Sequence, residues 1–466
     1  MPIQPFNTLS TVIDRATDLA RGVRHSFFGC SCFCSLPDEI LLIIFRLVEE
    51  FTRDEWNQTL ETEQEIIYLG LHLSHVCRKW RRVALGVPSL WSGIHISQYE
   101  LPQAPSSTLS NSIRHFVHYS STMFLNITVP AGTHHILASL PTQRVRSLAI
   151  YGTLDAIYDA SMQWGTHFPV LEDLILQVSP LPPPIQGFER ETPIVEESFF
   201  DFFPAMTWLT LQNVDHIPRH RRASALRRLT WSIDPQCELV SLSFSHFHDL
   251  TDVRYLELDM PNLSGDVFRI AESLEEMVFK NASATIINTL VVTPAPNLTS
   301  LTITSAENIT FGLVEFLKDT QGERIRALSL SLVDISSTEW YFILYRVPNV
   351  ERLELGLTPT VALPYPLMEL MDALTMHLTH TIIVPKLSEL RLAGDVLAGI
   401  VRVADFLRVR SMESHITGKQ RVAAVNALVL PIGYFTRIPE PLAWELESFA
   451  VVSADAALNY LAEPIF

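Results

Sequence analysis

Glycine, and the catalytic motifs built on it, are scarce in this sequence. Only 17 of the 466 residues are glycine, and no glycine-rich phosphate loop followed by Lys-Ser or Lys-Thr occurs. Neither a Gly-x-Ser-x-Gly nor a His-Glu-x-x-His motif is present. Two histidine pairs, His134-His135 and His246-x-His248, come nearest to a metal site, but neither has a third ligand at a suitable spacing. The sequence therefore predicts no catalytic centre, no cofactor and no metal site.

Cysteine is also rare, with five residues in the whole chain. An odd and low count excludes a disulfide framework and favours a reducing compartment. Cys30, Cys32 and Cys34 alternate beside two phenylalanines, but a chelating loop usually has two residues between its thiolates. We expect inert cysteines in a flexible leader, with reversible acylation as the alternative.

Basic residues are outnumbered by acidic ones, and long apolar runs are absent. Lys and Arg number 34 against 51 Asp and Glu, a formal charge of −17, which argues against a nucleic-acid partner. No apolar run reaches the roughly eighteen residues that a membrane span needs. Asp14 and Asp18 fit neither a signal peptide nor a transit peptide. We expect an intracellular protein of the cytoplasm, the nucleus or both.

Two short stretches near the N-terminus carry more apolar surface than they can bury alone. In the first, Pro37 stands where a helix can start, and Asp38 and Glu39 suit its first turn. A wide apolar stripe follows, made of Ile40, Leu41, Ile44, Phe45, Leu47 and Val48. The second stretch predicts a helix with one apolar face, made of Leu73, Val76, Cys77, Trp80, Val83 and Ala84, before Pro88-Ser89-Leu90-Trp91 ends it. A module of about fifty residues rarely forms a stable core, so a partner or the rest of the chain must cover it.

These stretches resemble the F-box. The resemblance rests on Leu36-Pro37-x-Glu39-Ile40-Leu41, on Val76-Cys77-Arg78-Lys79-Trp80 and on Leu90-Trp91. The segment 51–70 is longer than in compact members and looks like the longer-looped fungal variant. The resemblance implies docking on a Skp-family adaptor and, through it, a cullin. Its implied contact residues are Leu36, Pro37, Ile40, Leu41, Ile44, Val76 and Trp80. The alternative is an ordinary apolar helical hairpin.

Beyond Trp91 the sequence is periodic. A phrase of the form apolar-x-x-apolar-x-apolar recurs eleven times, and its ten steps from Val145 to Val425 cover 280 residues, a mean of 28. Leucine-rich repeats have periods of roughly 20–29 residues. The phrases begin at Val145, Leu171, Met206, Leu226, Val253, Leu274, Leu298, Ile325, Val350, Leu387 and Val425.

The connections between phrases predict helices. Helix-like stretches lie at 311–318, 339–346, 367–378 and 400–409. Five phrases have a proline two residues before the first apolar position, which predicts a helix-to-strand junction: Pro169, Pro204, Pro296, Pro348 and Pro385. Each unit is thus one short parallel strand and one outer helix. The predicted fold class is α/β, a small helical F-box followed by an irregular leucine-rich-repeat-like solenoid.

The resemblance to leucine-rich repeats is partial. The Asn or Cys that a regular repeat places three residues after the third apolar position is missing, and the steps vary from 20 to 38 residues. We predict a leader at 1–34, the F-box-like domain at 35–92 and the solenoid at 93–466. Residues 90–129 are expected to form degenerate first repeats packed on the F-box-like helices. Leu181-Pro182-Pro183-Pro184 predicts a surface loop, with a proline-recognition ligand as the alternative.

By these resemblances the chain is predicted to be a non-catalytic substrate-recognition adaptor of a Skp–cullin–F-box ubiquitin ligase, with an unknown target protein on the solenoid. The alternatives are a non-degradative interaction scaffold and an enzyme with a site of scattered residues. A reader of phosphorylated targets would need an arginine cluster. The candidates are Arg219, Arg221, Arg222, Arg227 and Arg228, which are more simply a solvated loop and helix end.

Overall fold

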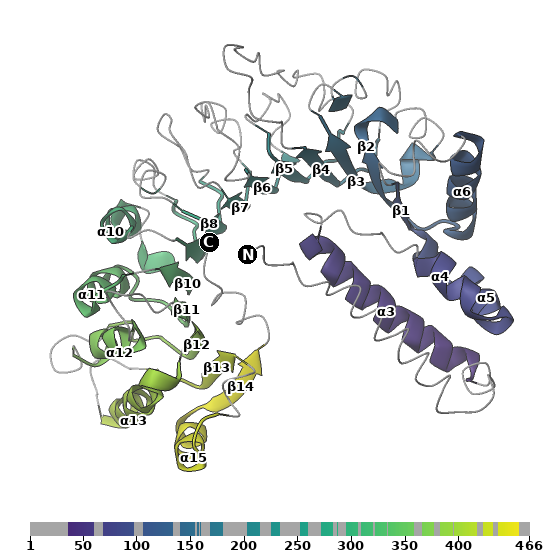
Figure 1. The fold of residues 1–466 in the computed structure, drawn as a ribbon. Coiled ribbons are helices and arrows are strands. Elements are labelled where there is room, and N and C mark those ends of the chain that lie inside the picture. The colour runs from purple at the N-terminus through teal and green to yellow at the C-terminus, as the bar shows by residue number, and fades with distance from the viewer. Residues whose placement is uncertain are drawn as a thin grey trace, which may run out of the picture. The chain divides into compact units, whose positions relative to one another are not determined.

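The structure is a computed structural model. It describes residues 36–59, 69–96, 106–133, 140–153, 156–157, 159, 168–179, 203–214, 225–233, 252–259, 272–282, 287, 295–305, 309–319, 322–332, 334–357, 366–376, 383–394, 396–416, 423–431 and 437–455. The chain divides into two compact units, Met1–Pro130 with Ser139–Arg146, and Ala131–Ala138 with Ser147–Phe466. Figure 1 shows the elements of both.

The first unit is mainly helical. Its described elements are α3 (Asp38–Thr59), α4 (Leu69–Val76), α5 (Arg78–Leu85), the 3-10 turn η1 (Pro88–Trp91), β1 (Gly93–His95), α6 (Ser106–Tyr119), β2 (Leu125–Pro130) and the 3-10 turn η3 (Thr142–Arg144). The N–H of Leu41 donates to the carbonyl of Pro37 at 3.2 Å, so the helix begins where the proline predicts. The expectation that the segment between the helices starts at residue 51 is wrong. No glycine or proline interrupts 38–59, and α3 continues to Thr59.

The second predicted helix is in fact two helices. Cys77 separates α4 from α5 and is extended, with φ −158° and ψ 173°. Its Sγ accepts a hydrogen bond from the N–H of Trp80 at 3.5 Å, which caps the start of α5. The single apolar face predicted from Leu73 to Ala84 is therefore broken in the middle. Val76, at the end of α4, is exposed, whereas Val83 and Ala84 on α5 are buried.

Residues after η1 pack on the helical part, as expected. The Trp91 ring lies 5.3 Å from that of Phe116 and 5.0 Å from that of Tyr119, both on α6. Its indole N–H donates to the carbonyl of Ala84 at 2.8 Å, which satisfies the polar atom of a buried side chain. Trp91 thus joins α5 and α6 into one core.

A buried histidine in β1 makes this unit acid-sensitive. Burial lowers the pKa of His95 from its ordinary value to about 4. Between pH 6.5 and 4 the unfolded chain binds a proton that the folded chain excludes, so stability falls as the pH falls. We expect a loss of about 2 kcal/mol from pH 7 to pH 5. Denaturant unfolding across this range measures it. His95→Gln should flatten the slope, and an unchanged slope in that variant would contradict the assignment.

Repeating strands dominate the second unit. All eleven predicted strands are confirmed, and a twelfth, β14 (Val451–Asp455), follows them. They are β3 (Val145–Gly152), β4 (Asp173–Val178), β5 (Trp208–Gln212), β6 (Arg228–Ser232), β7 (Tyr255–Asp259), β8 (Glu276–Lys280), β9 (Ser300–Thr304), β10 (Ala327–Leu332), β11 (Arg352–Leu357), β12 (Glu389–Gly394) and β13 (Ala427–Pro431). Within the described residues of the second unit, the strands from β3 to β14 pair in parallel in the order of the sequence.

The apolar positions of the phrases are aligned by the strand register. Leu209 pairs with Leu229 and Leu229 with Leu256, and the same row continues through the neighbouring strands. The side chains of this row are buried, and the residues on either side of them are partly exposed. Because side chains alternate across a strand, one face of the sheet forms the core, and the other carries residues that differ from one strand to the next.

The five prolines occupy one recurring turn. Pro348 is the second residue of a turn closed by a hydrogen bond from Val350 N–H to Val347 carbonyl at 3.2 Å. Equivalent bonds join Leu171 to Phe168, Met206 to Phe203, Leu298 to Ala295 and Leu387 to Val384. The prediction of a plain helix-to-strand junction is therefore refined, since the proline fixes a turn whose first residue is buried.

Helices cover the core face at the C-terminal end of the second unit. The four predicted helices are confirmed as α10 (Thr310–Asp319), α11 (Ser337–Arg346), α12 (Pro366–Met376) and α13 (Ile400–Ile416), and α15 (Glu440–Phe449) is a further one. They lie side by side along the outer side of β9–β14 (Figure 1). The strand-plus-helix unit predicted from the sequence is thus present here, and the architecture is that of a parallel α/β repeat.

Candidate docking surface of the helical module

One side of α3 forms the core of the helical module, residues 36–91. Leu41 and Phe45 have no exposed surface. The Phe45 ring meets the Trp80 ring edge-to-face, with centroids 5.2 Å apart. Leu73, Val83, Ala84, Leu90 and Trp91 complete this buried cluster. The spacing of Leu41 and Phe45, four residues apart, fixes which side of α3 faces α5.

The other side of α3 leaves large apolar side chains in solvent. Ile40 is 42% exposed, Ile43 54% and Leu47 59%, and their spacing of three and four residues places them on one stripe. Val76, at the end of α4, is 57% exposed, and Leu71 also reaches the surface. Isolated exposed apolar residues are ordinary, but a contiguous stripe along a helix is typical of a protein-binding surface.

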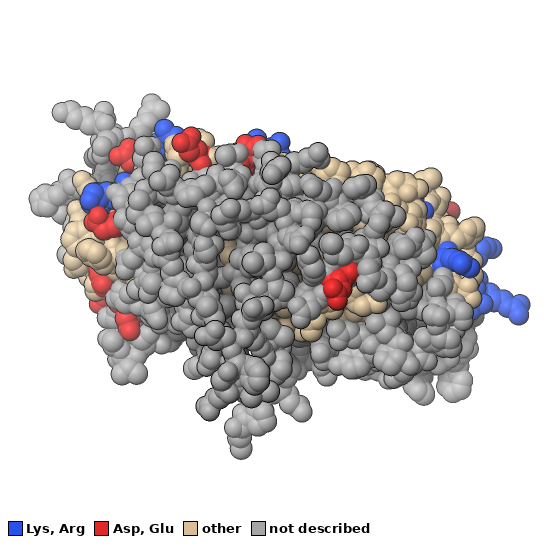
Figure 2. Space-filling model, turned by 90° about the horizontal axis from the view of Figure 1, so that it is seen from above, with Lys and Arg blue, Asp and Glu red and all other residues tan. Residues whose placement is uncertain are grey.

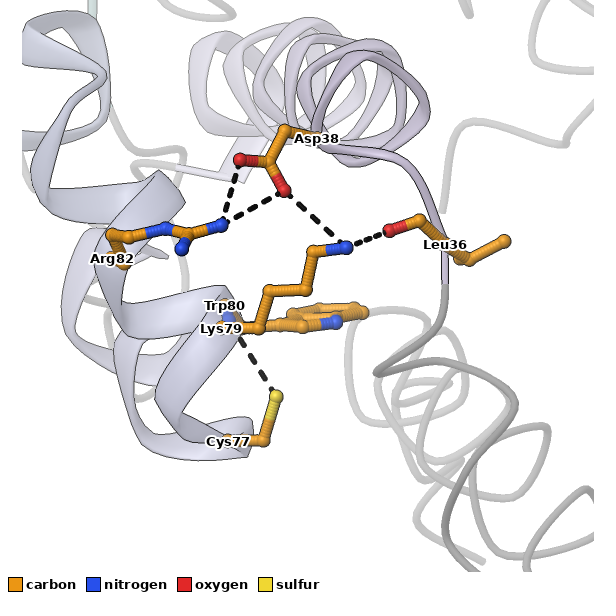
Figure 3. A network of polar contacts seen from close by, with 6 residues as sticks. All are labelled: Leu36, Asp38, Cys77, Lys79, Trp80 and Arg82. Atoms are coloured by element: carbon orange, nitrogen blue, oxygen red, sulfur yellow. Dashed lines mark hydrogen bonds and ion pairs between the residues drawn. The ribbon is translucent and has the colours of Figure 1, made fainter.

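A polar network ties the start of α3 to α5. Figure 3 shows the Asp38 carboxylate between Arg82 and Lys79, at 2.9 Å and 3.3 Å from their nitrogens. Lys79 Nζ also donates to the carbonyl of Leu36. Because these groups are partly in solvent, each ion pair adds at most about 1 kcal/mol. Their main effect is to hold the Leu36-Pro37 turn against α5.

The seven predicted contact residues fall into three groups in the structure. Ile40, Val76 and Pro37 are exposed, and Leu36, Ile44 and Trp80 are partly buried. Leu41 is fully buried, so it supports α3 from inside and cannot touch a partner in this conformation. Ile43 and Leu47, which the sequence prediction did not include among the contact residues, are exposed on α3 as well. Their position beside the buried pair, on the remaining side of α3, was the available signal.

The arginine cluster differs from its prediction. Arg219, Arg221 and Arg222 lie outside the described residues. Arg227 is an exposed residue just before strand β6, as a solvated loop predicts, but Arg228 begins the strand itself and so belongs to neither a loop nor a helix end. The Arg228 guanidinium lies over two aromatic rings, a placement taken up below.

Charge on the described surface is mixed. Figure 2 shows one face of the molecule, on which Lys and Arg side chains lie beside Asp and Glu side chains at the left end. Ion pairs among the described residues include Arg326 with Glu351 and Lys280 with Glu257. This arrangement suits protein contacts more than the continuous basic surface that nucleic acid requires.

Other predictions fall outside the described part of the chain. These are Cys30, Cys32 and Cys34, the pairs His134-His135 and His246-x-His248, and the segment 181–184. Among the residues that are described, no group of three His, Cys, Asp or Glu is placed to hold a metal ion. In the same residues no helix has the length and apolarity to cross a membrane.

Comparison with known proteins supports the helical module. Residues 33–97 match the family described as F-box-like. No curated protein matches the chain. One solved structure that it resembles is a crystal structure of a protein from Bacteroides fragilis. The identity is 12%, the match covers 55% of this chain and 67% of the other, and the TM-score is 0.29. The module is thus F-box-like, and the parallel repeat follows it.

Proposed function

We propose that the chain is the substrate-recognition adaptor of a Skp–cullin–F-box ubiquitin ligase. The F-box-like match at residues 33–97 supports this role in general terms. In this proposal the module at 35–92 docks a Skp-family adaptor and, through it, a cullin. The repeat at 93–466 holds a target protein, and residues 1–34 form a leader. The chain itself performs no chemistry and acts by raising the local concentration of the target.

The observation that carries the proposal is the exposed apolar stripe of α3. Ile40, Ile43 and Leu47 present three large side chains that the module does not cover. Burying such a side chain at an interface is worth about 1.5–3 kcal/mol. A helical partner surface would cover the stripe together with Val76 and the Pro37 turn. Leu41 and Phe45 hold the stripe in place from the buried side.

We therefore expect Ile43→Arg/Leu47→Arg to weaken binding to a Skp adaptor about a hundredfold, because two apolar anchors would become charges at the interface centre. Isothermal titration or pull-down of the purified full chain with the adaptor measures this. The core side chains are untouched, so the thermal melting of the variant should match that of the wild type.

A matched control is Phe342→Arg, which adds a charge at an equally exposed apolar residue, 50% exposed, on α11 of the second unit. It should leave adaptor binding unchanged. A folded wild-type chain that does not bind the adaptor, or equal effects of both variants, would reject the proposal. The non-degradative scaffold would then be the better description, because it uses the repeat surface alone.

A further inference from the structure

Three consecutive strands bring two aromatic rings and one guanidinium into a single stack. Trp208 on β5, Arg228 on β6 and Tyr255 on β7 are direct register partners. The Arg228 guanidinium carbon lies 4.0 Å from the centroid of the Trp208 ring and 3.9 Å from that of the Tyr255 ring. A guanidinium held between two rings has little conformational freedom left to lose on binding. The stack is therefore a rigid feature of the sheet face opposite the core.

Carboxylates surround this stack. Asp173 on β4 is the register partner of Trp208, and its carboxylate accepts a hydrogen bond from the Ser147 hydroxyl at 3.0 Å. On the other side, the Tyr255 hydroxyl donates to Glu257 at 2.5 Å, and Lys280 pairs with Glu257 at 2.7 Å. Glu276 is the register partner of Tyr255, and Asp259 lies further along β7. Across β4–β8 these four carboxylates face two cations, Arg228 and Lys280.

The chain compensates the burial of two of the carboxylates only in part. Burial raises the pKa of Asp173, and neither the Ser147 hydroxyl nor the charge of Arg228 offsets it. Burial likewise raises the pKa of Asp259 in spite of a hydrogen bond from Asn281. Asp173 Oδ1, Trp208 Nε1 and Arg228 Nε are buried and form no hydrogen bond in the described structure. Extra positive charge from outside would stabilise the ionised form of both aspartates.

On strands β9 and β10 the same face carries small residues in the positions compared. The positions equivalent to Trp208, Arg228 and Tyr255 are Ser300 on β9 and Ala327 on β10. The row beside them carries Thr302 and Ser329. Aromatic residues with a rigid arginine are the groups that most often dominate binding energy at protein interfaces. These groups are therefore concentrated on β5–β7, between the carboxylates of β4 and those of β7–β8.

We propose that this surface, formed by Asp173, Trp208, Arg228, Tyr255, Glu257 and Glu276 and called the β4–β8 surface, binds a target segment that presents Lys or Arg side chains. The inference rests on the proposed function, which assigns the target to the repeat. A target cation pairs with the exposed Glu276 at one end, and the charge of the largely buried Asp173 adds to the attraction at the other end. The intervening apolar groups lie on the rings. Aromatic faces accept the stems of long basic side chains as well as their charges.

A phosphorylated segment fits this surface less well. Arg228 is the cation at its centre, and a phosphate bound there would lie beside the carboxylates of Asp173 and Glu257. Phosphate carries close to two negative charges at neutral pH, and like charges at short range are repulsive. Glu257 is firmly ionised. Its burial acts to raise its pKa, but the hydrogen bonds from Lys280 and Tyr255 outweigh this, so the pKa lies below its usual range.

Fluorescence anisotropy with the full chain tests the proposal. The probe is a labelled Gly/Ser peptide with interspersed lysines, and the comparison peptides carry glutamate or phosphoserine at the same places. We expect the lysine peptide to bind wild-type protein and Asp173→Asn/Glu276→Gln to weaken it about tenfold. Trp208→Leu should also weaken binding, since it removes one side of the stack.

The matched control is Glu354→Gln/Glu389→Gln, which removes the same charge from the same face on β11 and β12. It should change the affinity less than about twofold, because only the general field of the protein is altered. Thermal melting of each variant verifies that it is folded.

Three results would overturn the proposal: no binding of the lysine peptide, equal losses in both double variants, or tighter binding of the phosphoserine peptide. None of these variants touches α3. A chain that binds a Skp adaptor but gives any of these results retains the proposed function and loses only this surface.

Discussion

Phe45→Ala is expected to unfold most of the helical module and to abolish adaptor binding without touching the partner. Phe45 is fully buried and meets Trp80 edge-to-face. Truncating a buried phenylalanine costs about 3–5 kcal/mol, from lost burial and from the cavity left behind. Small domains are only marginally stable, so this loss is most of what such a module has. Hydrogen exchange of the amides in α3–α5 measures it directly.

The neighbouring exposed residue is the control for Phe45. Leu47→Ala removes an apolar side chain of similar chemistry two residues away, yet Leu47 is 59% exposed. Its effect on hydrogen exchange should stay within about 0.5 kcal/mol, while adaptor binding weakens. Similar protection in Phe45→Ala and in wild-type protein would show that the packing described for α3 is wrong. The two variants therefore distinguish a buried residue that supports α3 from an exposed residue that is proposed to contact the adaptor.

Gly394→Ala is the second change with a large expected effect. Gly394 ends strand β12 with φ +94°, a conformation that side chains strongly disfavour. A Cβ there would also overlap the carbonyl of Leu357, the last residue of β11 and its register partner. The carbonyl oxygen and carbon of Leu357 are backbone atoms and not the end of a flexible side chain, so the backbone itself must shift. We expect a destabilisation of about 2–5 kcal/mol, from conformational strain together with overpacking.

Denaturant unfolding of the full chain, combined with hydrogen exchange on β11 and β12, tests this expectation. Gly93→Ala is the control, because a Cβ at Gly93 in β1 would meet nothing within 4 Å. It should change stability by no more than about 0.5 kcal/mol. If Gly394→Ala were as stable as the Gly93 variant, the close approach of β11 and β12 at this edge would be refuted.

Much of the repeat was predictable because each strand is specified by a short local pattern, and the copies of that pattern agree with one another. In Leu226…Leu229…Trp231 the alternating residues must share one face, and the same holds for every copy. A proline at a constant distance ahead of five copies fixed their phase, and the structure places those prolines in equivalent turns. Parallel pairing of successive strands then follows from the period alone. The four outer helices were predicted from helix-like stretches that lie between these phrases.

The candidate surfaces were predicted less completely. The break between α4 and α5 at Cys77 is accompanied by a weak hydrogen bond to its Sγ atom. The spacing of apolar residues gives no sign of such a cap. The periodicity predicted one wide stripe on α3 and did not separate the buried Leu41 from the exposed Ile40 and Leu47, because that division depends on where α5 packs. The stack of Trp208, Arg228 and Tyr255 could be predicted only with the register of strands β5–β7. Each residue directly precedes the second apolar position of its phrase, so aligning the phrases in columns would have revealed it.

The strand order has a consequence for how such a protein changes over generations. From β3 to β14, each described strand pairs only with its neighbours in this series. Gain or loss of one repeat thus requires new pairing at a single junction and leaves every other pair intact. The surface of the repeat can lengthen, shorten or exchange segments while the F-box-like module stays the same. Selection can therefore change the residues that the repeat displays without changing those of the F-box-like module.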